Sequence, residues 1–156
     1  MTDTETKLAD AKIQLNLALD NIKNYEAVRS CINAFISTAR SVTFAMQKES
    51  ADSKTFATWY AQKQQQMKSN PMLKFFNEQR TISIHQRSVK PNQRRVNILS
   101  IQVGGKVVGT GGTVMTYEFE GYREIVPDDS GNVFRLCSEY LTYLDKLVQE
   151  WLHLTK

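Results

Sequence analysis

Hydrophobic positions recur at alternating steps of three and four along most of the chain, a pattern that predicts amphipathic helices. In the second such segment, Val28, Ile32, Phe35, Ala39 and Val42 form one stripe, and further apolar positions flank it. That helix is therefore expected to touch more than one neighbour. We expect helices at residues 4–24, 25–49 and 54–68, from 71 to a residue between 83 and 88, and at 132–154.

The period changes from helical to alternating after Pro91, where β-branched residues become frequent. Residues 98–103 and 113–119 predict strands, and Gly104-Gly105 predicts a hairpin turn. A second glycine group at residues 109–112 allows one more turn, so the segment has two or three strands. We place this β insertion at about residues 94–122.

Local signals mark where two of the helices begin. Asn70 suits the N-cap and Pro71 the first helical position of the fourth helix. Asp128-Asp129-Ser130 is expected to cap the last helix. The sequence thus predicts one mainly α domain over residues 1–156, a four- to five-helix bundle with an inserted antiparallel β-hairpin before the C-terminal helix.

Composition narrows the class of protein. The chain has 156 residues, of which 41% are hydrophobic and 23% charged, as in ordinary globular domains. No apolar run approaches the ~20 residues of a membrane span. The acidic N-terminus does not resemble a secretory signal, so we expect a cytoplasmic protein. Cys31 and Cys137 fall on apolar helix faces and are expected to be free thiols.

Charge is distributed unevenly along the chain. The net charge is +4, yet no acidic residue lies between Glu78 and Glu118. That basic stretch predicts an anionic partner, because local charge governs association more than the total does. Its six cationic residues are Arg80, Arg87, Lys90, Arg94, Arg95 and Lys106.

One pair of residues in this stretch suggests chemistry. Arg80 precedes His85 with four residues between them, near the predicted end of the fourth helix. An R-x4-6-H motif late in a small helical bundle resembles the HEPN (higher-eukaryote and prokaryote nucleotide-binding) superfamily. The resemblance covers about residues 4–88 and 132–156. It implies a metal-independent endoribonuclease or an RNA-binding relative that needs no cofactor, acts as a homodimer and belongs to a toxin–antitoxin or defence system.

The resemblance also implies roles for single residues. His85 would transfer a proton at the ribose or the leaving oxygen, and Arg80 would stabilise charge on the scissile phosphate. Thr81 stands where active members usually have Asn, Asp or His, which weakens the expectation of activity. The residues expected to bind the RNA substrate are Thr81, Arg87, Lys90, Arg94 and Arg95.

Arg80 and Arg40 each have a purely structural explanation as an alternative to a functional one. Arg80 could pair with a carboxylate such as Glu78, leaving His85 an ordinary helix-end residue. Arg40 lies in the middle of the second helix, beside the apolar Ala39. The aliphatic part of the Arg40 side chain could pack on apolar neighbours while its guanidinium reaches water or a carboxylate. Alternatively, Arg40 could be a second cation in a cleft.

A second function from a different class is open. The bundle could be a non-enzymatic scaffold whose Gly-rich hairpin offers an edge strand or a basic surface to an antitoxin or another protein partner. Binding of a small ligand within the bundle finds no polar constellation in the sequence. Two scattered His and no CxxC motif predict no metal site.

Overall fold

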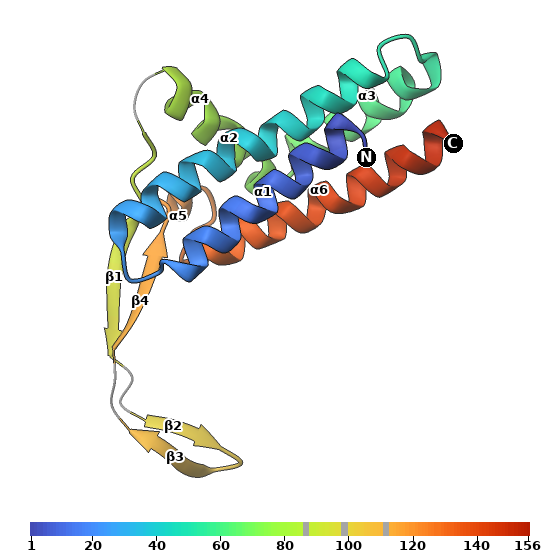
Figure 1. Ribbon diagram of the computed structural model, residues 1–156. Coiled ribbons are helices and arrows are strands. Elements are labelled where there is room, and N and C mark those ends of the chain that lie inside the picture. The colour runs from blue at the N-terminus through green and yellow to red at the C-terminus, as the bar shows by residue number, and fades with distance from the viewer. Residues whose placement is uncertain (86–87, 98–99, 111–112) are drawn as a thin grey trace.

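The structure is a bundle of helices from one end of which a β-hairpin projects (Figure 1). This computed structural model describes residues 1–85, 88–97, 100–110 and 113–156. Within those ranges, the side chains of residues 82–85, 96–97, 100–103, 107–110 and 113 are not described. The predicted mainly helical bundle with a hairpin before the C-terminal helix is confirmed.

Most helix bounds follow the hydrophobic pattern closely, although the first helix ends at Asp20 and not at residue 24. The pattern did not predict the short α5, β1 or β3, and of the predicted strand 98–103 residues 98–99 lie outside the described residues. The elements are, in order, α1 (Asp3–Asp20), α2 (Tyr25–Glu49), α3 (Lys54–Ser69), α4 (Pro71–His85), β1 (Asn92–Asn97), β2 (Ser100–Val103), β3 (Lys106–Thr110), β4 (Thr113–Glu118), α5 (Tyr122–Ile125) and α6 (Val133–Thr155).

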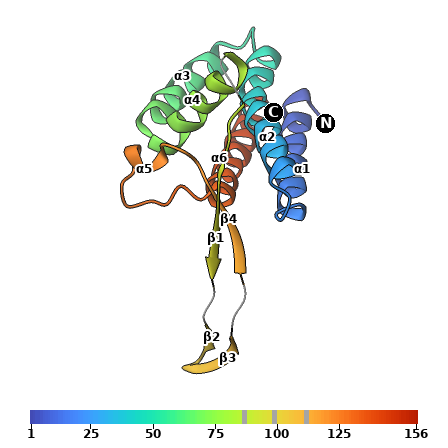
Figure 2. The same ribbon diagram turned by 90° about the vertical axis from the view of Figure 1, so that its left-hand side faces the viewer.

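Helix α6 is the element that joins the two halves of the bundle. Helices α1 and α2 lie side by side along α6 in Figure 1, and Figure 2 shows α3 and α4 on its other side. Helix α6 contacts all four of these helices. The broad apolar face of α6 therefore closes the core, as the sequence predicted for the last helix.

An aromatic cluster forms the centre of this core. The ring of Tyr140 from α6 stacks on Phe76 of α4 with 4.6 Å between centroids, and Phe35 of α2 meets Tyr140 edge-on at 6.3 Å. Phe75 continues the cluster to Phe119, which follows β4, at 5.3 Å. Such pairs add about 0.5–1.5 kcal/mol each beyond the burial of their area. The core thus extends from the bundle to the base of the hairpin.

Of the two predicted helix starts, one is confirmed and one is wrong. Asn70 caps α4 as expected, accepting hydrogen bonds from the N–H groups of Met72 and Leu73. The last helix is capped by Asn132, which accepts from the N–H of Arg135, and not by residues 128–130. Asn132 directly precedes the first helical residue, so its side chain reaches the free N–H groups of the first turn.

Four strand segments form two antiparallel pairs, and we call the described residues 90–97, 100–110 and 113–118 the arm. Strand β1 pairs with β4 near the bundle, with Arg94 opposite Thr116 and Arg95 opposite Met115. Strand β2 pairs with β3 at the far end. The turn between them is Gly104-Gly105, as predicted, with φ angles of 59° and 78° that favour glycine.

Two side chains fasten the base of the arm to the bundle. Asn33 of α2 donates to the carbonyl of Val89 at 2.7 Å and accepts from its N–H at 2.8 Å. Tyr117 of β4 is fully buried, and its hydroxyl donates to the carbonyl of Ile22 at 2.5 Å. The arm therefore leaves the bundle from a fixed base.

Two further expectations concern the chain as a whole. Both cysteines are free thiols, and Cys137 is buried in the core. Among the described residues, no helix is both long and apolar enough to cross a bilayer.

The hydroxyl of Tyr117 offers a direct test of how the arm is held. We expect Tyr117→Phe to lower the free energy of unfolding by about 1–2 kcal/mol, because the part-buried carbonyl of Ile22 loses its donor. Urea unfolding followed by circular dichroism measures the change. The matched control is Tyr25→Phe, since the Tyr25 ring stacks beside Tyr117 while its hydroxyl has no hydrogen-bond partner in the described part of the chain. Equal effects of the two substitutions would contradict this role.

Candidate functional site

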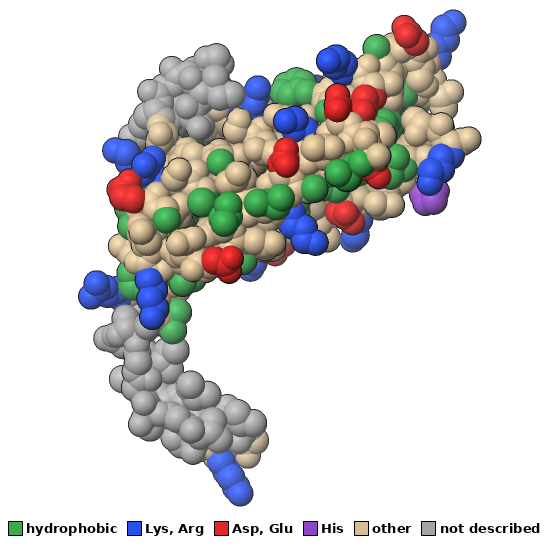
Figure 3. All heavy atoms as spheres, viewed as in Figure 1, with side chains coloured by type: hydrophobic (Ala, Val, Ile, Leu, Met, Phe, Trp, Pro, Cys, Tyr) green, Lys and Arg blue, Asp and Glu red, His purple; other side chains and the backbone are tan. Residues whose placement is uncertain are grey.

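The arm carries exposed cations along its length. Lys90 precedes β1, Arg94 and Arg95 lie on β1, and Lys106 follows the turn at the tip. All four residues are exposed. Figure 3 shows positive side chains where the arm leaves the bundle and again at its far end. These positions suit contact with an extended anion rather than with a compact one.

Only one of these cations is neutralised by a neighbour. Arg94 donates to the carboxylate of Glu118 across the strand pair at 3.2 Å. Within the described residues, Arg95, Lys90 and Lys106 have no carboxylate within 4 Å. Three of the four charges on the arm therefore remain available to a partner.

The residues of the Arg–His motif lie on α4. Arg80 places its guanidinium 5.0 Å from the ring centroid of Phe44 on α2, and no carboxylate pairs with it among the described residues. The hydroxyl of Thr81 donates to the carbonyl of Asn77 within the helix. His85 is the last residue of α4, and its side chain lies outside the described residues, as does the whole of Arg87. Pairing of Arg80 with Glu78 is not observed.

Arg40 approaches the same aromatic ring. Its guanidinium lies 4.8 Å from the centroid of Phe44, so two arginines from two helices meet one half-exposed ring. Arg40 also has no ion pair within the described part of the chain. Of the two alternatives for Arg40, this position favours a cation facing a cleft, because among the described side chains its guanidinium contacts the Phe44 ring and donates to the hydroxyl of Thr43 at 3.2 Å but meets no carboxylate.

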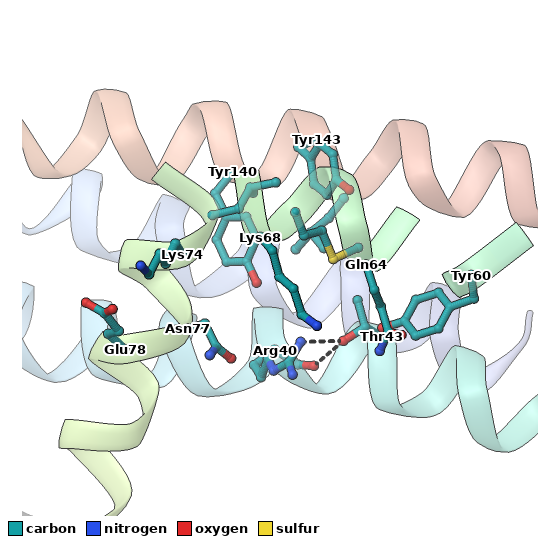
Figure 4. Close-up of a pocket in the computed structure, with 13 residues that line it drawn as sticks. Arg40, Thr43, Tyr60, Gln64, Lys68, Lys74, Asn77, Glu78, Tyr140 and Tyr143 are labelled. Carbon is teal, nitrogen blue, oxygen red and sulfur yellow. Dashed lines mark hydrogen bonds between the residues drawn. The ribbon is translucent and has the colours of Figure 1, made fainter. Parts of the chain in front are cut away.

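That cleft is a cavity of about 480 Å³, which we call the bundle pocket. Four helices build it, each through residues spaced three or four apart, which places them on one face. The close-up in Figure 4 shows the polar ones around a common space. The lining residues are Arg40 and Thr43 from α2, Tyr60, Gln64, Met67 and Lys68 from α3, Leu73, Lys74, Asn77 and Glu78 from α4, and Tyr140, Tyr143 and Leu144 from α6.

The polar groups of the bundle pocket are incompletely satisfied. The Nε of Arg40 is buried and has no hydrogen-bond partner, and the same holds for the hydroxyl of Tyr143 on the opposite wall. In Figure 4 the side chain of Lys68 extends toward Arg40 and Thr43. Two cations thus converge without a carboxylate between them; Lys68 is exposed to solvent, whereas burial of the Arg40 Nε without a partner is unfavourable.

The two tyrosines of α6 remain neutral hydrogen-bond donors. Burial raises the pKa of Tyr140 to about 12, although the positive charge of Arg40 opposes this shift. Burial also raises the pKa of Tyr143 to about 12. Both hydroxyls therefore keep their protons at physiological pH and can donate to an acceptor in the pocket.

The described side chains are better arranged to hold an anion than a metal ion. The bundle pocket has three cationic residues, Arg40, Lys68 and Lys74, and one carboxylate, Glu78. Among the described residues, no group of three or more His, Cys, Asp or Glu is placed to hold a metal. A guanidinium with a free N–H matches the lone pairs of a carboxylate or phosphate.

Sequence reasoning missed this pocket. Tyr60 and Tyr140 have the spacing of an ordinary buried helix face, so the sequence does not mark them as ligand-binding residues. The sequence shows no polar constellation for a ligand within the bundle, because the lining residues come from four helices spread over about 100 positions. The signal that was present was Arg40, a permanent cation at the border of an otherwise apolar stripe.

Comparison with known proteins identifies the N-terminal helices. The model of the family described as "Bacteriophage lambda protein ea47" matches residues 1–88, more than half of the chain. No curated protein and no solved structure matches. The matched part contains α1 to α4 and ends before the arm.

This match contradicts the resemblance to the HEPN superfamily. A motif of two residues with a variable spacing is too short to identify a family in a chain with eight Arg and two His. The expectations of a ribonuclease and of a toxin–antitoxin setting depended on that resemblance and lose its support. The chain belongs to the bacteriophage lambda protein ea47 family.

Proposed function

We propose that this protein binds nucleic acid through its arm, by contacts between the arm's cations and the phosphate backbone. The observation that supports this function is a projecting two-stranded ribbon with exposed cations, in a stretch where residues 79–117 contain no Asp or Glu. Phosphate contacts from Lys and Arg supply most of the sequence-independent affinity for nucleic acids.

The dimensions of the arm favour duplex DNA over duplex RNA. Paired strands lie about 4.8 Å apart, and the major groove of B-DNA, about 12 Å wide, admits a two-stranded ribbon. The deep, narrow major groove of A-form RNA does not. RNA is the partner expected from the sequence, and single-stranded RNA would bind the arm through backbone charge.

The two arginines of β1 differ in what they can offer to DNA. Adjacent residues of a strand point to opposite faces, so Arg94 and Arg95 lie on different sides of the ribbon. Glu118 pairs with Arg94 and reduces the charge of its face. Arg95 has no such partner among the described residues and is the stronger candidate for a phosphate contact.

Substitutions that change charge on the arm in opposite directions test this function. We expect Arg95→Gln to weaken binding to a 20-base-pair DNA duplex and to reduce the salt dependence (the slope of log K against log salt) by about one. Glu118→Gln should strengthen binding, because it releases Arg94. Fluorescence anisotropy over a salt series measures both effects.

The matched control is Lys146→Gln, which removes one exposed charge from α6, far from the arm in sequence. An equal loss in this control would mean that overall charge, and not the arm, attracts DNA. The same series with a labelled RNA in EDTA distinguishes binding from cleavage. Cleavage that disappears in His85→Ala would refute a purely binding role.

A specific observation supports a second candidate, binding of a protein to the arm. Within the described residues, each sheet of the arm has only two strands, so each strand keeps an edge that no other strand pairs, apart from the bridge between Glu118 at the end of β4 and Asn132. Such an edge can accept an added strand from another chain. If the protein shows no salt-sensitive binding to either DNA or RNA, this candidate is favoured over the first.

A further inference from the structure

We propose that the bundle pocket binds a small organic oxyanion, with its phosphate or carboxylate between Arg40 and Lys68 and its apolar or aromatic body against the α6 wall. This site is separate from the arm and does not depend on the function proposed above. Its residues come from α2, α3, α4 and α6, and none of them lies on the arm.

The first argument is the uncompensated charge. All sixteen acidic residues of the chain lie among the described residues. None of these carboxylates comes within 4 Å of Arg40 or Lys68 in that described part. A cation whose Nε is buried and unpaired is unfavourable by itself. An oxyanion placed there supplies the acceptor and the opposite charge together.

The second argument is where the unsatisfied groups occur. Among the described side chains, two buried polar atoms lack a partner, Arg40 Nε and Tyr143 Oη. Both belong to residues that line the bundle pocket, and they come from α2 and α6 on different walls. Buried polar groups are hydrogen-bonded in the great majority of cases, so two exceptions at one cavity favour a ligand that can partner both.

The third argument is the size and character of the cavity. Its volume of about 480 Å³ falls in the range of small-molecule sites and exceeds what an inorganic anion would fill. Apolar side chains complete the lining, namely Met67, Leu73 and Leu144. The ring of Tyr140 adds an aromatic surface next to Arg40. An organic body is therefore needed to use the space.

Four probes separate the parts of this ligand. Phenyl phosphate and benzoate carry an anion on an aromatic body, inorganic phosphate lacks the body, and benzyl alcohol lacks the charge. We expect saturable binding of phenyl phosphate or benzoate to the full chain by isothermal titration calorimetry. Inorganic phosphate and benzyl alcohol should bind at least about tenfold more weakly. Tighter binding of phenyl phosphate would identify the preferred headgroup as phosphate, and tighter binding of benzoate would identify it as carboxylate.

The proposal is overturned if neither aromatic anion binds, or if inorganic phosphate binds as tightly as phenyl phosphate. The first outcome would leave Arg40 as a solvated cation with a structural role. The second would reduce the site to a nonspecific anion contact. The arm variant Arg95→Gln should bind the aromatic anion like the wild type, so failure of one function does not imply failure of the other.

Two substitutions test where the anion binds, and a third substitution serves as their control. Arg40→Gln and Lys68→Gln should each weaken binding of the aromatic anion about tenfold or more, because each removes a charge-assisted contact. Lys68 is exposed, so its substitution should leave folding intact. Arg123→Gln, an exposed arginine on α5, serves as the control and should change nothing. Loss of affinity in Arg123→Gln equal to that in Lys68→Gln would refute the assigned position.

Tyr143→Phe distinguishes a binding role from a structural one. Removing a buried hydroxyl that has no partner should leave the melting temperature of the free protein unchanged or raise it. The same change should weaken binding of the aromatic anion several-fold, because one donor is lost. A lower melting temperature with unchanged affinity would show instead that the hydroxyl supports the fold. Differential scanning fluorimetry with and without phenyl phosphate gives both readings.

Discussion

The packing of α6 against α2 and α4, through Tyr140 on Phe35 and Phe76, is the interaction on which the rest of the structure depends. Helix α6 comes after the arm in sequence but returns between the two helix pairs. Its return brings the two ends of the arm together at one end of the bundle, where β1 and β4 pair. The arm can therefore project outward without removing any helix from the core.

The same helix contacts also create the bundle pocket. Tyr140 stacks on Phe76 in the core and lines the cavity beside Arg40, so one ring belongs to both. A well-packed core would have filled this space with apolar side chains. The chain instead keeps a buried Nε of Arg40 and a buried hydroxyl of Tyr143 without partners. Stability lost in this way is typical of a site that is completed by its ligand.

Several features of the fold were predictable because neighbouring residues decide them. The stripes of apolar residues located the helices, Asn70-Pro71 marked the start of α4, and Gly104-Gly105 marked the turn at the tip. The cap of α6 was assigned to residues 128–130 because several capping residues compete there. The Arg80–His85 spacing misled in a similar way, since a local pattern was read as evidence for a distant family.

By itself, the sequence determined the helices, the hairpin and the basic character of the arm, because periodicity, turn residues and charge act over a few positions. Only the tertiary structure decided which cations lack a carboxylate. Arg94 is paired across the strands, whereas Arg40 and Lys68 converge from different helices with no acid between them. Whether a buried group is satisfied depends on residues far away in the chain, and packing alone brings those residues together.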